Sequence, residues 1–216
     1  HFAVDAIRYY LCAIAPESKD SAFDWDDLFA RYNGELCDVV GNFVHRSLTM
    51  TVKNFDNKVP TPGPLDAEDQ TMLDAIPAQL DEIAAALEDF RFRQALEKLV
   101  DLGRKANVYF DGKQPWVTRK TDLERTGTTL YVCCQVVHAL CHAMLPFLPD
   151  GARTLAGILG ATLPEGGPDG GADGWADGKK PLEAGAPLNT PMVLFPKLDK
   201  DRIAELAAAH ERGEAF

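Results

Sequence analysis

Apolar residues recur every three or four positions along most of the chain, with polar residues between them. This spacing predicts helices over residues 3–13, 24–53, 73–90, 92–110, 122–145, 150–159 and 199–214. A run of β-branched residues within 122–145 has some strand character, but its length and its helical neighbours favour a helix. The pattern therefore predicts an all-α protein, folded as an antiparallel helical bundle.

Prolines and glycines mark the breaks between these helices. Three prolines and a glycine within 60–64 exclude a helix there, and Pro77 predicts either a kink or a helix that begins at that residue. Eight glycines between 160 and 187 indicate a flexible connector, with Trp175 as a local anchor, before an extended, docked segment at 194–198. We divide the chain into a connecting element (1–24), the bundle (25–160), and a linker with a docked segment and terminal helix (161–216).

The helix predicted over 24–53 has one apolar face and one polar stripe. Glu35, Asp38, Asn42 and Arg46 form the stripe at i, i+3, i+7 and i+11. Asn42 and Arg46 are one turn apart, which sets an amide beside a guanidinium fork, a pair able to read the edge of an exposed nucleobase. The alternative is an exposed helix face on which Arg46 contacts only Asp38 or Glu35.

The net charge of −11 counts against a nucleic-acid partner, because phosphate binding needs local positive potential. The charges are segregated, however. Residues 61–90 contain eight acids and no Lys or Arg, whereas residues 91–125 contain nine bases against five acids, so the local charge changes from −8 to +4. This predicts a basic surface, although such runs are also typical of the solvated faces of neighbouring helices.

Cysteines and hydropathy indicate the compartment. The five cysteines lie inside predicted helices without the spacing of a disulfide framework, as expected of reduced, buried thiols. We find no apolar run long enough to span a bilayer and no signal-peptide pattern, so we expect a cytoplasmic protein without membrane contact. Because the chain does not begin with Met and starts in what reads as helix interior, we expect it to be part of a longer protein.

One further constellation has the residue types of a zinc site. Cys134, His138 and His142 stand at i, i+4 and i+8, with Cys141 adjacent. Their neighbours are apolar and no Cys-x-x-Cys pair elsewhere supplies further ligands. We therefore expect these side chains to pack in the core and to bind no metal.

Two segments about seventy residues apart resemble one protein family. Gly-Asn-Phe-Val-His-Arg at 41–46 and Ala-Asn-Val-Tyr-Phe-Asp-Gly-Lys-Gln-Pro-Trp at 106–116 resemble the anticodon-binding helical domain of class I methionyl-tRNA synthetases. Residues 1–10 look like the segment after that family's Lys-Met-Ser-Lys-Ser loop, and residues 194–197 look like its C-terminal return segment. Sibling synthetases for isoleucine, valine, leucine and cysteine are similar in having a helical bundle here, so they remain open.

The resemblance implies that Asn42, Arg46 and Trp116 meet the CAU anticodon of methionine tRNA, chiefly its cytosine. A splayed base stacks on an aromatic ring while polar groups read its edge, so Trp116 tolerates any base and the polar pair selects. Without the resemblance, Trp116 reads as an ordinary core tryptophan. The residues implied to shape the site without reading the base are Asn107, Tyr109 and Pro115.

The resemblance also implies an ATP-dependent methionine–tRNA ligase whose catalytic domain lies N-terminal to His1. The family signatures His-Ile-Gly-His and Lys-Met-Ser-Lys-Ser are absent from this sequence. We therefore expect no cofactor in this segment, ATP with magnesium for the parent enzyme, and two partners, methionine tRNA and the chain's own catalytic domain. The segment alone should be inactive.

A protein-interaction module is the alternative of a different class. The acidic face at 66–89 would then dock a basic partner. The position of Trp116 distinguishes the two: a fully buried ring more than roughly 10 Å, a helix diameter, from Asn42 and Arg46 would favour the interaction module.

Overall fold

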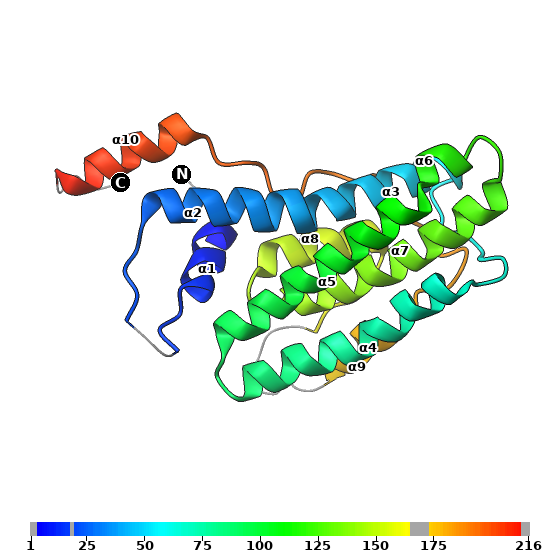
Figure 1. Ribbon diagram of the computed structural model, residues 1–216, viewed down its shortest axis with the longest axis horizontal. Helices are drawn as coiled ribbons and strands as arrows, with labels where there is room; N and C mark the ends of the chain where they lie inside the picture. The colour runs from blue at the N-terminus through cyan, green and yellow to red at the C-terminus, as the bar shows by residue number, and fades with distance from the viewer. Residues whose placement is uncertain (1–3, 18–19, 165–172, 213–216) are drawn as a thin grey trace.

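The computed structural model describes residues 4–17, 20–164 and 173–212, and within these ranges it contains helices and no β-strand. The helices are α1 (Val4–Ala13), α2 (Trp25–Arg31), η1 (Tyr32–Gly41), α3 (Asn42–Asn54), α4 (Ala67–Glu88), α5 (Phe92–Lys113), α6 (Pro115–Thr118), α7 (Leu123–Met144), α8 (Pro149–Leu159), α9 (Asp173–Lys179) and α10 (Lys200–Glu211). Long helices lie side by side as a bundle, with α1 crossing one end (Figure 1). The predicted all-α bundle is confirmed.

The polar stripe lies on one continuous helix formed by α2, η1 and α3. Asp24 caps its start, accepting a hydrogen bond of 2.7 Å from the Asp27 amide, as its position before an acidic first turn predicts. The middle ten residues, η1, are π-helical rather than α-helical. The Asn42 N–H accordingly donates to the Cys37 carbonyl, five residues back. The helix itself was predictable, but its π-helical segment was not.

Helix α4 continues through Pro77 without a break. It begins ten residues earlier, where Asp66 and Asp69 form a capping box, so a helix that starts at Pro77 is the wrong prediction. A proline inside a helix costs roughly 3 kcal/mol. The capping box and the burial of Met72, Ile76 and Leu80 offset that cost.

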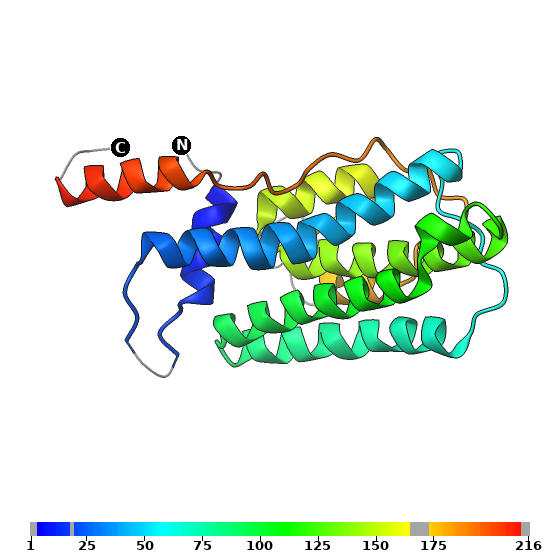
Figure 2. The same ribbon diagram turned by 45° about the horizontal axis from the view of Figure 1, so that its top comes forward.

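Helix α7 is the centre of the core. All of its residues from Thr126 to Leu130 and from Val132 to Met144 are buried, as expected of a helix that is apolar all round. Figure 2 shows this helix among α3, α5 and α8. The β-branched run is therefore helical, as its length predicts. No helix in the described ranges has both the length and the apolar character needed to cross a membrane.

The chain after α8 covers the bundle from outside. Within the predicted connector, residues 165–172 lie outside the described ranges, and α9 brings Trp175 against the core as predicted. Residues 188–198, which we call the strap, run extended along the bundle to α10 (Figure 2). Its end is fixed by two hydrogen bonds between the Asn33 amide and the Leu198 backbone, of 3.1 and 2.9 Å. Ile203, 2% exposed, then seats α10 against Leu28 of α2.

Candidate nucleic-acid interface

Arg46 and Trp116 lie against each other where α3, α5 and α6 meet. The Arg46 guanidinium carbon is 5.5 Å from the Trp116 ring centroid and 4.6 Å from that of Phe110. Its Nη2 donates to the Asp111 carboxylate at 2.9 Å. Trp116 is half-buried rather than fully buried. The two halves of the motif therefore meet in space, contrary to the arrangement that would favour an interaction module.

Asn42 is the first residue of α3, one turn before Arg46. Its side chain is exposed, and the side chain of Arg46 is 34% exposed. An amide and a guanidinium one turn apart on α3 therefore both reach solvent, the guanidinium beside an aromatic ring. This is the residue set that recognition of an unstacked base requires.

The segment that carries Trp116 is helical, whereas the helix predicted from the sequence ends at residue 110. Helix α5 continues to Lys113, Gln114 adopts a left-handed conformation with φ of 48°, and α6 begins at Pro115. Proline suits the first helical position because its ring fixes φ and no partner for its nitrogen is needed. Pro115 is buried and sets the turn from which the adjacent indole projects.

Asn107 connects α5 to the π-helix. Its side-chain amide donates to the Val39 carbonyl at 3.0 Å and to the Gly103 carbonyl at 2.9 Å. Both hydrogen bonds use the side-chain nitrogen of Asn107, which is thereby committed to contacts within the protein. Its hydrogen bond to Val39 fixes the backbone three residues before Asn42.

Tyr109 lies away from the Arg46 cluster, on the side of α5 that faces α4. Its hydroxyl donates to Asp69 at 2.7 Å, and burial together with this hydrogen bond raises the pKa of Tyr109 well above its ordinary value. Tyr109 thus holds α5 to α4. Any effect on the candidate interface passes through the position of α5.

Asp69 is a fully buried carboxylate and the centre of an ion cluster. The Nη2 atom of Arg125 donates to both of its oxygens at 2.6 and 2.7 Å, and the Lys113 ammonium lies 3.6 Å away. Burial alone raises the pKa of Asp69, but hydrogen bonds from Arg125, the Asp66 backbone and Tyr109 outweigh it and lower the pKa overall. The cluster ties α4, α5 and α7 together, and the sequence shows no local motif for it.

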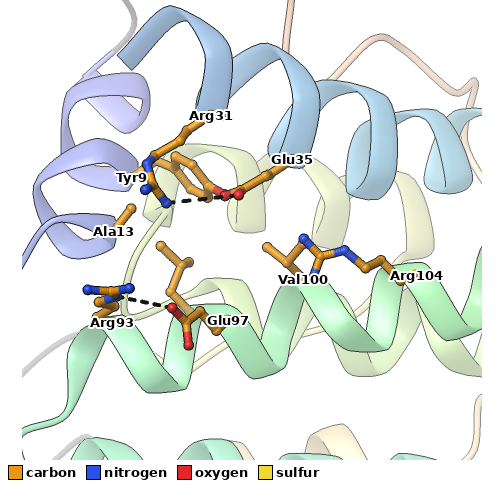
Figure 3. Close-up of a pocket in the computed structure, with 9 residues that line it drawn as sticks. Tyr9, Ala13, Arg31, Glu35, Arg93, Glu97, Val100 and Arg104 are labelled. Atoms are coloured by element: carbon orange, nitrogen blue, oxygen red, sulfur yellow. Dashed lines mark hydrogen bonds and ion pairs between the residues drawn. The ribbon is translucent and has the colours of Figure 1, made fainter. Parts of the chain in front are cut away.

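The two acids of the predicted stripe point away from Asn42 and Arg46. Glu35 accepts a hydrogen bond of 2.6 Å from the Tyr9 hydroxyl, and Asp38 pairs with Lys197 of the strap at 2.8 Å. Glu35 lines a cavity of about 210 Å³ between α1, η1 and α5. Figure 3 shows Tyr9 and Arg31 beside Glu35 in this cavity. Its rim mixes acids and bases, so it offers no site selective for one sign of charge.

The predicted basic surface is smaller than the sequence indicates. Bases of 91–125 mostly pair within the fold, for example Lys98 with Glu82 at 2.6 Å and Arg104 with Asp101 at 2.7 Å. Most of this charge is therefore neutralised by acids of the same helix or of the α4 segment. Across the described ranges, the basic side chains without a hydrogen-bond or ion-pair partner are those of Lys53, Lys58, Arg119, Lys120 and Lys200.

Four of those five bases lie at the end of the bundle that carries Trp116. Lys53 is in the last turn of α3, Lys58 follows it, and Arg119 and Lys120 follow α6. Figure 1 shows the end of α3 and α6 together at this end. Positive charge available for phosphates is thus concentrated around the candidate interface.

The candidate zinc residues are packed in the interior. Cys134 is buried with its sulfur 3.8 Å from the Thr51 hydroxyl, and the Nε2 atoms of His138 and His142 are 3.2 Å apart. Burial lowers the pKa of His138 to about 4, which favours the neutral ring. Within the described ranges, no three His, Cys, Asp or Glu side chains are grouped as a metal site requires.

Family models match both parts of the chain. Residues 59–213 match the anticodon binding domain of methionyl tRNA ligase, and residues 1–48 match the class I tRNA synthetases of the methionine type. The methionine–tRNA ligase of Pyrococcus abyssi is 39% identical over 94% of this chain, and that of Bacteroides fragilis is 39% identical over 90%. The chain spans 27% and 28% of the length of these two relatives.

Solved structures agree with the sequence matches. The free form of Mycobacterium tuberculosis methionyl-tRNA synthetase superimposes with a TM-score of 0.82 at 30% identity, over 91% of this chain and 39% of that one. Its complex with methionyl-adenylate gives a TM-score of 0.81 at 31% identity, over 89% of this chain and 37% of that one.

Proposed function

The chain belongs to the methionine–tRNA ligases, with most of it in their anticodon-binding domain, and we propose that it reads the CAU anticodon of methionine tRNA through Asn42, Arg46 and Trp116. One observation carries this proposal. Two distant segments bring the partly exposed guanidinium of Arg46 against the half-buried indole of Trp116, with the exposed amide of Asn42 one turn before Arg46 on α3. The unpaired bases Lys53, Lys58, Arg119 and Lys120 lie at the end of the bundle that carries Trp116.

In this proposal the cytosine is splayed out of the loop and stacks on Trp116. Arg46 donates to the O2 or N3 acceptor of the base, while Asn42 supplies both a donor and an acceptor for its edge. Asp111 holds the guanidinium through its 2.9 Å hydrogen bond, and Phe110 supports it from below. Arg46 therefore meets the base with its donors already ordered, which lowers the entropic cost of binding.

For the whole protein, we propose ATP-dependent and magnesium-dependent attachment of methionine to its tRNA. Activation of methionine belongs to the protein's own N-terminal catalytic domain, which we propose as the second partner beside methionine tRNA. Residues 25–160 serve as the anticodon-binding bundle, 1–24 as the connecting element and 161–216 as the return segment. The five free cysteines favour a reducing compartment, and we assign the protein to the cytoplasm.

Two alternatives have less support. The acids of α4 that an interaction module would present are partly occupied by Lys98, Lys113 and Arg125 of the same chain. A sibling synthetase is disfavoured because the relatives described above are methionine–tRNA ligases.

The chain is expected to distinguish the CAU loop from a loop with a changed first base. We expect tighter binding of a CAU stem-loop by about 1–3 kcal/mol, the usual value of good polar contacts to one base edge. Titration of both loops at one fixed salt concentration measures this difference, since salt alone changes affinity. Equal affinity for the two loops would show that Asn42 and Arg46 do not recognise the first base of the anticodon.

Charge removal at Arg119 and Lys120 is expected to weaken all loops alike. Phosphate contacts carry no sequence information, so the R119A/K120A variant should lose affinity equally for CAU and altered loops. Its dependence of log Kd on log salt should be shallower by roughly one for each phosphate that the variant no longer neutralises. Lys200→Ala is the matched control, because Lys200 is also unpaired but lies on α10. A loss confined to the CAU loop would contradict phosphate binding.

A further inference from the structure

The ten residues that lead into Asn42 form a π-helix held by contacts from three directions. From α1, the Tyr9 hydroxyl donates to Glu35 at 2.6 Å. From the strap, Leu198 is hydrogen-bonded to Asn33. From α5, Asn107 donates to the Val39 carbonyl at 3.0 Å. A π-helix is rare and is frequently found at functional sites, so contacts that maintain this one need an explanation.

The Val39 carbonyl links Asn107 directly to Asn42, the first of the two polar residues proposed to recognise the base. This oxygen accepts the backbone N–H of Asn42 as well as the side-chain amide of Asn107. The end of the π-helix and the start of α3 are thus fixed at one atom. Asn107 is the side chain that approaches that atom from outside the helix.

Gly103 allows α5 to come close enough for this contact. A Cβ at Gly103 would lie 3.2 Å from the side chains of both Val39 and Val40, closer than ordinary van der Waals contact. Asn107 stands one turn further along α5, on the same side. The pair therefore combines close backbone approach with a hydrogen bond, and both act on the last turn of the π-helix.

The π-helix changes the direction in which the following residues face. An α-helix turns the chain by about 100° per residue, and a π-helix, whose hydrogen bonds span one residue more, turns it by less. Over ten residues the difference accumulates into a large rotation. Glu35 faces α1 and Asp38 faces the strap, whereas Arg46 faces Trp116 and Asn42 is exposed one turn before it, although α-helical spacing would align all four.

We propose that the π-helical segment sets the direction of Asn42 and Arg46, and that Asn107 is the positioning residue that locks this setting through the Val39 carbonyl. The inference rests on the proposed anticodon function and assigns a mechanism to a residue that touches no base. Asn107 supplies a second donor to the Val39 oxygen, beside the Asn42 N–H, and so ties the end of η1 to α5. Without this hydrogen bond, η1 is expected to relax toward α-helical geometry. That change would alter the directions in which the Asn42 and Arg46 side chains point.

The test is the ratio of affinities for the CAU loop and the loop with a changed first base. Asn107→Leu keeps the size and branching of the side chain but removes both hydrogen bonds. We expect it to lower that ratio about tenfold, the equivalent of one misplaced hydrogen bond. Asn189→Leu is the matched control, because Asn189 also donates to a helix carbonyl, that of Gly157 at 2.8 Å, but on α8. It should lower the melting temperature and leave the ratio unchanged.

A second variant keeps the proposal testable should Asn107→Leu fail to fold. Gly103→Ala retains every polar group and pushes α5 away from Val39, so it should also lower the ratio. Gly157→Ala, where a Cβ meets nothing within 4 Å, is its control. Suppose that the unaltered chain distinguishes the two loops but a folded Asn107 or Gly103 variant shows the same affinity ratio. That result overturns this inference and leaves the proposed function standing. Equal binding of both loops by the unaltered chain overturns the proposed function and this inference with it.

Discussion

Replacing Trp116 by alanine is expected to weaken binding of a CAU stem-loop by about 1–3 kcal/mol, the value of one base stacked on an aromatic side chain. The indole is half-buried, with its ring centroid 5.8 Å from that of Phe110 and Arg46 over one face. Its removal takes away the stacking plane and also frees the guanidinium that the ring helps to orient. The loss of affinity should be similar for CAU and altered loops, because stacking accepts any base. Fluorescence titration with a labelled stem-loop measures it.

Two further variants separate stacking from packing at Trp116. Trp116→Phe retains an aromatic plane and should keep most of the affinity. Trp175→Ala removes another partly buried indole, on α9, and should lower stability without changing loop affinity. If Trp116→Ala binds as well as the unaltered chain, the ring is a packing residue and the proposed stacking is wrong.

The helices were predictable because they depend on residue types and spacing within single segments. Apolar periodicity predicted the long helices, including α7, whose β-branched stretch resembles a strand. The Asn42, Arg46 and Trp116 set was identified from a family resemblance, and the close approach of Arg46 to Trp116 agrees with it. Periodicity alone predicted the helices, whereas the pairing of two segments seventy residues apart was implied only by the resemblance.

The features missed by sequence reasoning depend on pairings between helices. The stripe of Glu35, Asp38, Asn42 and Arg46 assumes 3.6 residues per turn, and the π-helix η1 breaks that assumption. No residue type marks a π-helix, because it is maintained by partners such as Asn107 and Asn33 with Leu198. The basic character of 91–125 was overestimated for the same reason, since a sequence does not show which bases meet acids.

The segregated charges acquire a different meaning in the folded chain. The acids of α4 face bases of α5 and α7, with Lys113 bonded to Asp66 at 2.7 Å and Arg125 to Asp69. This complementarity aligns α4 with its neighbours and leaves the unpaired bases at the Trp116 end. Ion pairs between opposite charges therefore align α4 with α5 and α7. The bases that remain unpaired form the basic surface at the Trp116 end.

Replacing Asp69 by alanine is expected to lower the free energy of unfolding by about 3–5 kcal/mol, the cost of breaking a buried ion pair from one side. Arg125 and the Tyr109 hydroxyl would lose their common acceptor, and three helices would lose their junction. Urea denaturation at neutral pH measures the loss. Asp74→Ala is the matched control on α4, because Asp74 is exposed and accepts a hydrogen bond from Gln70 of the same helix. A loss equal to that of the control would contradict a structural role for the cluster.

Acid should remove the same stabilisation from the unaltered chain. Hydrogen bonds from Lys113 and the Asp69 backbone lower the pKa of Asp66 to about 2, and the pKa of Asp69 is also below its usual value. A carboxylate whose pKa is depressed by folding stabilises the fold fully above its unfolded pKa, near 3.8, and loses that contribution as protons bind. The free energy of unfolding should therefore fall as the pH drops from about 4 toward 2. Asp69→Asn should reduce this slope, since one fewer group titrates, and an unchanged slope would mean that acid acts elsewhere.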